Sequence, residues 1–375
     1  MNCNLTEIQQ AAQNTFAEFV NKRVMPQAAA IDEKAGFPME LFREVGGLGF
    51  FGMRYPEEAG GSSMDIVSYS LAVMELARGS LSLAAACTMQ SLMATYFLYR
   101  LGDDEVKTHF SAALKGEEIG GICMTEPNAG SDLMSLQSRA QVLHDGFILN
   151  GQKTWVTSAP VANFFTVLAK TDRAEGLSIF FVPTNLAGVS IGKSIGKLGV
   201  RGSVTSEVSF DNVRLPQNYL LGELGDGSKY LREVLAEIRI MTAALSVGVA
   251  TAAFEYALQY AKEREQFGRP IGKFQAVSMN LAEMDVQLET ARQYTLYAAS
   301  LSDAGPAQQK TAMIAKLYAS ECANAICDKA SRVMASYGYA MEYPLQRYLR
   351  DARFTLIGGG TSEILKINIG KELGL

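Results

Sequence analysis

The run Phe147-Ile-Leu-Asn-Gly-Gln-Lys-Thr-Trp-Val-Thr157 sets the fold class of this 375-residue chain. It is rich in aromatic and β-branched residues and predicts a strand, and similar short runs follow between 164 and 210, separated by turn residues. On both sides, up to about residue 117 and from about residue 228, apolar residues recur at three- and four-residue spacing, which indicates helices. Helices, then strands, then helices predict an α+β protein and argue against a βαβ nucleotide-binding fold.

The chain is long enough for two or three packed units. From the change of period we predict an N-terminal helical domain over 1–117, a middle β-domain over 118–227 and a C-terminal helical domain over 228–375. Hydrophobic residues make up 48% of the chain and charged residues 19%, as is typical of soluble globular proteins. The net charge of −5 argues against a nucleic-acid-binding protein, which normally carries a basic face.

The cysteines and histidines argue against several kinds of site. No two of the five cysteines form a Cys-x-x-Cys pair, so we expect reduced, buried thiols in a cytoplasmic protein. With only His109 and His144, we expect neither a metal site nor a Ser-His-Asp triad. We expect no signal peptide, because no basic segment precedes an apolar one at the N-terminus. The uncharged run 79–99 could cross a bilayer, but its Ser, Thr and Gln residues favour a buried helix, and we expect no membrane contact.

A glycine-rich turn lies near the C-terminus, in Leu356-Ile-Gly-Gly-Gly-Thr-Ser-Glu-Ile-Leu365. No strand clearly precedes it, and its spacing is not Gly-x-Gly-x-x-Gly, so it does not predict a dinucleotide site. One interpretation is a tight turn followed by a helix that is capped by Thr361 or Ser362. The free N–H groups at such a helix start could also bind an anion or a carbonyl.

Five motifs occur in order along the chain. They are Met124-Thr-Glu-Pro-Asn-Ala-Gly-Ser-Asp132, Asn150-Gly-Gln-Lys-Thr-Trp-Val-Thr157, Arg264-Glu-Gln-Phe-Gly-Arg-Pro-Ile271 with Gln275, Arg350-Asp-Ala352, and Gly360-Thr-Ser-Glu-Ile364. With the helix–strand–helix order, they resemble the acyl-CoA dehydrogenase family across nearly the whole chain. The resemblance implies a C-terminal four-helix bundle, FAD as cofactor and usually a homotetramer. It also implies an acyl thioester substrate, on CoA or an acyl carrier protein, and an electron-transferring flavoprotein as electron acceptor.

The resemblance places the flavin on the middle domain. Trp155 and Thr157 are two residues apart on a predicted strand and therefore share one face. By resemblance, Trp155 packs on the isoalloxazine and Thr157 bonds its N5 edge. Backbone around Met124 and Thr125 contacts the flavin, and Ser131 contacts the pantetheine arm of the substrate.

A second set of residues is implied at FAD, partly from a neighbouring subunit. By resemblance, the arginine of the third motif binds the pyrophosphate, for which its planar fork is suited. The family's Gln-x-x-Gly-Gly-x-Gly, at the adenosine half, appears here as Arg332-Val-Met-Ala-Ser-Tyr-Gly338, where the charge of the arginine could compensate for the changed residues. The candidates of this set are Arg264, Phe267, Gln275, Arg332, Ser336, Thr361 and Glu363.

The substrate is expected at the glycine turn. By resemblance, the thioester carbonyl lies against backbone at Gly359 and Gly360, and Arg239 lies near the polar end of the substrate. An ion pair of Arg239 with Glu237, Glu255 or a neighbouring carboxylate is the alternative interpretation.

The catalytic base is missing from both of its usual positions. In this family a carboxylate removes the proton next to the thioester carbonyl while hydride leaves the β-carbon for flavin N5. Most members carry it at the position of Gly359, and a branch similar to isovaleryl-CoA dehydrogenases carries it at the position of Ile238. Glu237 is the nearest candidate, but one residue rotates a helical side chain by roughly 100°, so we expect it to point elsewhere unless the helix is irregular.

We therefore predict an FAD-dependent acyl thioester dehydrogenase with altered proton chemistry. Three routes are open: Glu237 on a shifted helix, desaturation at another position with a base near Gln90 and Ser91, or an acyl group on a carrier protein. The alternatives are a degenerate member that binds FAD and an acyl ligand without oxidising it, and a reductase that runs the reverse reaction.

Overall fold

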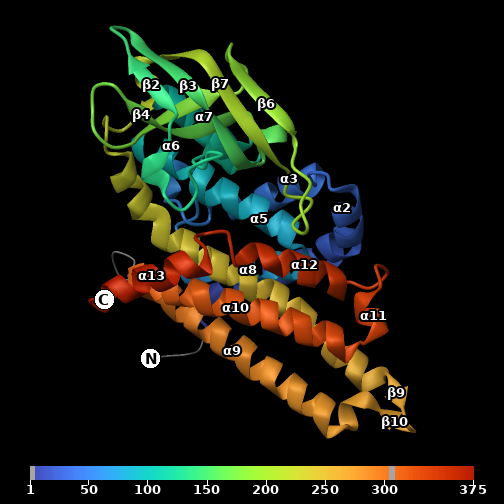
Figure 1. The fold of residues 1–375 in the computed structure, drawn as a ribbon. Coiled ribbons are helices and arrows are strands. Elements are labelled where there is room, and N and C mark those ends of the chain that lie inside the picture. The colour runs from blue at the N-terminus through green and yellow to red at the C-terminus, as the bar shows by residue number, and fades with distance from the viewer. Residues whose placement is uncertain (1–4, 304–308) are drawn as a thin grey trace.

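The computed structural model describes residues 5–303 and 309–375, in which a β-domain lies beyond one end of two helical regions (Figure 1). Within residues 5–117, the N-terminal region has seven α-helices. These are α1 (Glu7–Phe19), α2 (Ala28–Lys34), α3 (Met39–Gly47), α4 (Ile66–Gly79), α5 (Leu81–Met89), α6 (Tyr96–Leu101) and α7 (Asp104–Leu114). Side chains that precede the helices fix several of their starts: Thr6 and Gln9 form a capping box at α1, and Asp65 caps α4.

The uncharged run near residue 90 forms the core of this region. It comprises α5, a π-helical turn over Gln90–Ala94 and α6. The described residues include two helical stretches that are long and apolar enough to span a membrane, Leu81–Leu101 and Gly227–Glu263, and both are mostly buried inside the protein. We therefore interpret them as core helices, as expected for the first of them.

The middle region is an eight-stranded sheet. Its strands are β1 (Gly120–Cys123), β2 (Arg139–Val142), β3 (Gly146–Thr157), β4 (Phe164–Thr171), β5 (Ser178–Pro183), β6 (Val189–Ser194), β7 (Thr205–Pro216) and β8 (Leu220–Leu221). The order is β6-β7-β3-β2-β4-β5-β8, and β1 pairs with β4 in parallel. A separate apolar cluster fills the domain, with Phe147, Phe165 and Phe180 among its fully buried side chains.

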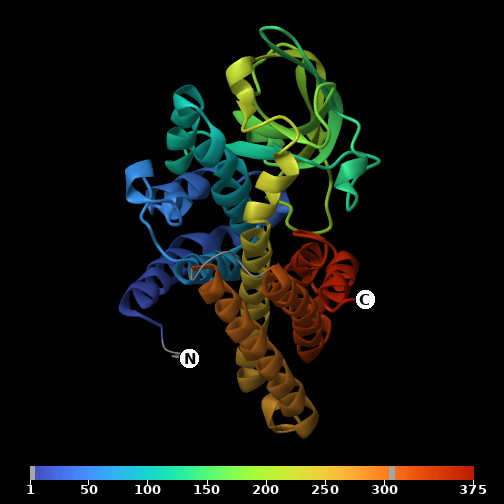
Figure 2. The same ribbon diagram turned by 90° about the vertical axis from the view of Figure 1, so that its left-hand side faces the viewer.

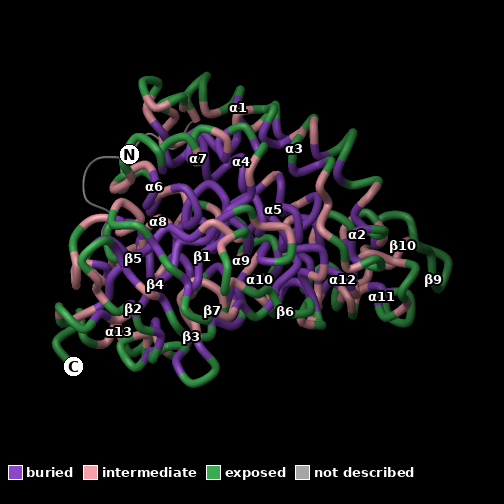
Figure 3. The backbone as a smooth tube through the Cα atoms, turned by 90° about the horizontal axis from the view of Figure 1, so that it is seen from above, coloured by how far each residue is buried: buried purple, intermediate pink, exposed green. Residues whose placement is uncertain are grey.

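The C-terminal region is a helical bundle built on one long helix. Its elements are α8 (Gly227–Glu263), the hairpin β9 (Glu265–Gln266) and β10 (Arg269–Pro270), α9 (Gln275–Asp303), α10 (Gln309–Val333), α11 (Ser336–Tyr339), α12 (Leu345–Thr355) and α13 (Ser362–Glu372). Figure 2 shows α8 running along the middle, with the N-terminal helices on one side and α12 and α13 on the other. Buried residues accordingly concentrate along the interior, whereas β9 and β10 form an exposed tip (Figure 3).

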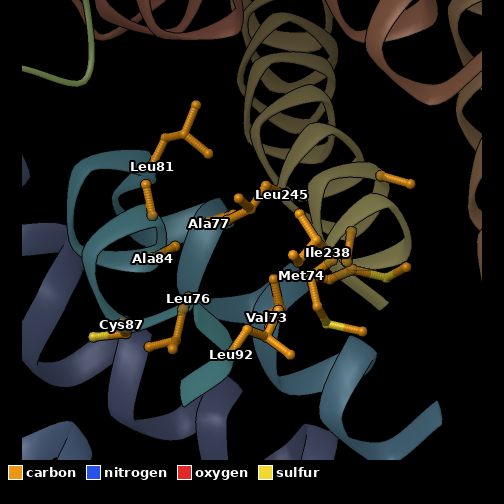
Figure 4. Packing of buried hydrophobic residues seen from close by; sticks show 14 of the residues in the cluster. Val73, Met74, Leu76, Ala77, Leu81, Ala84, Cys87, Leu92, Ile238 and Leu245 are labelled. Atoms are coloured by element: carbon orange, nitrogen blue, oxygen red, sulfur yellow. The ribbon is translucent and has the colours of Figure 1, made fainter. Parts of the chain in front are cut away.

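Helix α8 packs closely against α4. A Cβ atom at Gly248 would lie 2.3 Å from the carbonyl oxygen of Met74, so only glycine allows the two helices to approach this closely. Around this contact, Ile238 and Leu245 of α8 lie beside Met74 and Ala77 of α4 (Figure 4). All four side chains are buried, and their packing fixes the half of α8 that carries the candidate catalytic residues.

The Arg350-Asp-Ala352 motif joins the three regions. The guanidinium of Arg350 in α12 donates to both carboxylate oxygens of Asp32 in α2, with 3.0 Å from Nη1 to Oδ1. The next residue, Asp351, accepts a hydrogen bond of 2.6 Å from the backbone N–H of Val200 in the β-domain. Burial raises the pKa of Asp351 to about 6. Within the described part of the chain, this motif therefore has a structural role, because it links the three regions.

Candidate active site

Trp155 lies exposed on the β-domain. Its side chain is 57% exposed, and its φ of +59° coincides with a shift in the register of β3 against β7 between Lys153 and Val156. A left-handed backbone at so bulky a residue is unusual and accompanies this local bulge. The pattern of burial puts Val156 inside and leaves Trp155 and half-buried Thr157 facing outward, so the two predicted flavin contacts share one face.

An ion pair fastens the Met124–Asp132 loop to this strand. Glu126 accepts hydrogen bonds from the backbone N–H groups of Gln137 and Ser138 (2.5 and 2.9 Å) and from Nζ of Lys153 (2.8 Å). Nζ of Lys153 also donates to the carbonyl of Met124 at 3.2 Å. Burial raises the pKa of the Glu126 carboxyl, but the hydrogen bonds outweigh burial and lower it to about 2. Glu126, which directly precedes Pro127, therefore holds the loop in place against the strand.

An open hollow of about 690 Å³ lies between this loop and Trp155. Residues 125–130 line one side, and Thr154 and Trp155 line another. Met124 and Thr125 are half-buried at its start, and Ser131 is exposed just beyond it. An exposed indole beside ordered backbone gives a flat, partly apolar wall, which fits the ring system of a flavin.

The glycine turn lies between two helices, α12 and α13. Gly359 and Gly360 have φ of +71° and +103°, which glycine adopts without strain. A Cβ atom at Gly359 would lie 2.7 Å from Oγ1 of Thr242 in α8, so space as well as backbone requires glycine here. Nζ of fully buried Lys316 in α10 donates to the carbonyl of Gly360 at 2.6 Å. Thr361 caps α13 by accepting from the N–H of Ile364 (3.3 Å), which settles the choice between the two predicted caps.

The residues before Arg239 have different environments. Ile238 is buried among apolar side chains. Glu237 forms an ion pair with Arg54, whose guanidinium carbon lies 5.0 and 5.5 Å from the ring centres of Tyr55 and Tyr96. Because α8 is α-helical throughout, nothing in its backbone turns Glu237 toward the position of residue 238.

The alternative interpretation, an ion pair of Arg239 with Glu237, Glu255 or a neighbouring carboxylate, is wrong for the side chains that the structure describes. Glu237 pairs with Arg54, and Glu255 lies 4.0 Å from Arg78. Arg239 instead donates from Nη1 to Oε1 of Gln309 at 2.8 Å. Burial lowers the pKa of Arg239 to about 10. The following part of its own helix cannot supply a carboxylate partner, because the residues one turn after Arg239 are uncharged.

The predicted second FAD set lies at the other end of the molecule. Arg264, Phe267 and Gln275 are exposed around the β9–β10 hairpin, which lies at the end of α8 that is far from the β-domain (Figure 1). Arg332 is exposed and pairs with Asp328 of its own helix at 2.8 Å, and exposed Ser336 begins α11. Thr361 and Glu363 lie apart from these, at the start of α13. One chain therefore does not bring the hairpin residues to Trp155 and Thr157.

Four residues of this region were not singled out from the sequence: Arg54, Lys153, Thr242 and Lys316. Helical spacing could have indicated two of them. Thr242 follows Ile238 by four residues and so lies on the same side of α8. Lys316 interrupts an apolar stripe that includes Ala312 and Ala319, which places its charge inside the bundle. Arg54 gave no such indication, because it lies outside regular helices and strands.

Comparison with known proteins identifies the family. The acyl-CoA dehydrogenase N-terminal, middle and C-terminal domain models match residues 6–118, 121–213 and 225–374. The chain is 54% identical over 375 residues, 100% of both chains, to a benzylmalonyl-CoA dehydrogenase of Aromatoleum aromaticum. The structure of butyryl-CoA dehydrogenase from Megasphaera elsdenii matches with a TM-score of 0.96 and 34% identity, over 100% of both chains. A Mycobacterium smegmatis glutaryl-CoA dehydrogenase in complex with FADH2 matches with a TM-score of 0.94 and 32% identity, over 98% of this chain and 95% of that chain.

These matches confirm the predicted fold class, the cofactor and the reaction class. The degenerate, non-oxidising alternative is not favoured by relatives that are themselves dehydrogenases. The chain belongs to the acyl-CoA dehydrogenase family and is an FAD-dependent oxidoreductase that acts on the CH–CH bond of an acyl thioester.

Proposed function

We propose that the protein oxidises 2-carboxyacyl thioesters, such as benzylmalonyl-CoA, and releases CO2 where other family members release a proton. In benzylmalonyl-CoA a carboxylate stands on the carbon next to the thioester carbonyl. The bond to this carboxylate breaks, and its electron pair forms the new double bond as CO2 leaves. FAD supplies the acceptor for the hydride that leaves the β-carbon. A base is not required for this step, because CO2 takes the place of the proton.

The observation that carries the proposal is the absence of a carboxylate at both usual base positions, Gly359 and Ile238. The turn at Gly359 has no space for a side chain beside Thr242, and Ile238 is buried among apolar groups. Glu237 is held in an ion pair by Arg54, which directs its carboxylate to that partner. The full-length relative named for a malonyl thioester supports this substrate class.

We assign the FAD contacts to two subunits. Trp155 and Thr157, with backbone at Met124 and Thr125, would hold the flavin ring, and Ser131 would meet the pantetheine arm. Residues of the β9–β10 hairpin and of α10–α11 of another subunit would hold the rest of the cofactor. They are Arg264, Phe267, Gln275, Arg332 and Ser336, with Thr361 and Glu363 as further candidates. The separation of the two sets in one chain supports this assignment, and we propose a homotetramer.

Mixing two inactive variants tests the shared site. Trp155→Ala removes the flavin wall, and Arg264→Ala removes the arginine of the hairpin. If both act at one FAD in different subunits, oligomers refolded from a mixture regain some active sites with both residues intact. Recovery of FAD absorbance and activity in the mixture is expected. Activity that never exceeds that of the separate variants would contradict sharing.

Product analysis tests the proposed reaction. Purified, FAD-loaded protein is mixed with benzylmalonyl-CoA and, separately, with 3-phenylpropanoyl-CoA, which lacks only the carboxylate. An electron-transferring flavoprotein, the proposed partner, or ferrocenium serves as acceptor. We expect CO2 and the phenylpropenoyl thioester from the first substrate, and far slower reduction of the acceptor with the second. A product that keeps its carboxylate, or equal rates with both substrates, would overturn the proposal.

A further inference from the structure

Two buried cations lie close to each other near the glycine turn. Arg239 lies on α8 and Lys316 on α10, and neither forms an ion pair among the side chains that the structure describes. Burial lowers the pKa of Lys316 to about 8; the charges of Glu321 and Glu363 oppose this shift, and the positive charge of Arg239 adds to it. Buried charges are normally paired, so a buried arginine that forms no ion pair and lies close to a second cation indicates an anion that binds there.

Arg239 has hydrogen-bonding capacity to spare. Its side chain is more than nine-tenths buried, and Nη1 donates to Gln309. Its Nε is fully buried and has no hydrogen-bond partner in the described part of the chain. An unsatisfied buried donor of this kind is costly, and a bound carboxylate would satisfy it and neutralise the charge.

Thr242 supplies a hydroxyl next to the position of the missing base. It follows Arg239 by three residues, so the two side chains are neighbours on α8. Its Oγ1 lies 2.7 Å from the point where a side chain at Gly359 would begin. At present the hydroxyl donates to the carbonyl of Ile238 at 2.8 Å, a local bond that leaves its lone pairs free and that a rotation could exchange for a ligand oxygen.

We infer that Arg239 and Thr242 form the receptor for the substrate carboxylate that leaves as CO2, which rests on the proposed function. Lys316 is a positioning residue, because it holds the carbonyl of Gly360 and so fixes the turn against which the thioester lies. The receptor would stand where other members of the family carry the base. It selects substrates because an acyl thioester without the carboxylate leaves the buried guanidinium unpaired.

Equilibrium binding to the reduced holoenzyme tests the receptor without turnover, because reduced flavin cannot accept a hydride. The ligands are benzylmalonyl-CoA and 3-phenylpropanoyl-CoA, and calorimetry gives Kd for each. We expect Arg239→Gln to raise Kd about a hundredfold and Thr242→Val about tenfold for the carboxylated ligand only. Thr242→Ser should keep the preference. Thr251→Val is the matched control, because Thr251 makes the same bond to the residue four positions before it on α8.

Each outcome bears on the receptor. An equal loss of affinity for both ligands would show that these residues bind the CoA part that the ligands share. Unchanged Kd values would show that they do not contact the ligand. Either result would overturn the receptor. If Arg239→Gln does not fold, Arg239→Lys, which keeps the charge but loses the fork, gives the same comparison. If the wild type prefers the carboxylated ligand but releases no CO2 on oxidation, the receptor stands and the proposed function fails. If CO2 is released but the variants have no selective effect on Kd, the proposed function stands and the receptor fails.

Discussion

The hydroxyl oxygen of Thr242 lies 2.7 Å from the position that a Cβ atom at Gly359 would occupy. These residues come from α8 and from the turn before α13, the two segments that carry the usual base positions. A side chain at residue 359 would therefore require Thr242 to shift. The packing of the turn, as well as its sequence, opposes a carboxylate at this position.

Gly359→Ala is expected to lower the melting temperature. An alanine at φ of +71° costs about 1 kcal/mol or more, and its methyl group would also press on Thr242. Adding Thr242→Ala, which removes the nearest atom, should restore part of the loss. Gly370→Ala is the control, because Gly370 lies in α13 with nothing near its Cβ position. Equal melting of Gly359→Ala and wild type would show that the turn tolerates a side chain.

Ile238→Glu is expected to create an ordinary dehydrogenase. Position 238 lies inside a regular helix, so the backbone accepts any helix-forming residue. Burial would raise the pKa of the new carboxyl toward the range that suits a base at neutral pH. The variant should bleach its flavin with 3-phenylpropanoyl-CoA, which is followed at the flavin absorption band. Ile238→Gln, which has the shape of the glutamate variant but no basic oxygen, should not bleach its flavin. If the FAD-bound Ile238→Glu variant is as inactive as Ile238→Gln, the prediction is contradicted.

Glu237→Gln should destabilise the protein but leave CO2 release largely intact. Removing one partner of a largely buried pair leaves Arg54 uncompensated, which costs about 3 kcal/mol. The double variant Arg54→Met with Glu237→Met should be more stable than Glu237→Gln, as urea unfolding would measure. Complete loss of flavin reduction in folded, FAD-bound Glu237→Gln would instead identify Glu237 as the base.

Much of this architecture could be predicted because the spacing of apolar residues and the sequence motifs indicate the same fold. The short runs of aromatic and β-branched residues located β3, β4, β5 and β7, since each of these strands buries apolar side chains on one or both faces. The strands β1, β2, β6 and β8 were not located. They have two to six residues, and β6 is almost wholly exposed, so neither length nor alternation marks them.

The site was harder to predict because its unusual features are contacts between distant segments. The sequence showed that positions 359 and 238 carry no carboxylate, but not what faces Gly359 and Ile238. Thr242 meets the turn because α12, which precedes the turn, packs on α8, and Arg54 reaches Glu237 across 183 residues of chain. Spacing along one helix cannot indicate such partners, whereas it did show that Glu237 points away from the position of residue 238.

The Glu126–Lys153 pair should make the flavin face of the β-domain sensitive to acid. Hydrogen bonds hold the pKa of folded Glu126 at about 2, below its ordinary value of 4.5. A carboxyl whose pKa is lower in the folded than in the unfolded protein stabilises the fold, fully so at pH values above the unfolded pKa. This stabilisation is lost as the pH falls from about 4.5 toward about 2. The free energy of unfolding in urea should therefore be higher for wild type than for Glu126→Gln at neutral pH, and the difference should shrink through this window. Glu58→Gln, at an exposed side chain, should follow wild type at every pH, and a difference for Glu126→Gln that does not change with pH would disprove the role of the charge.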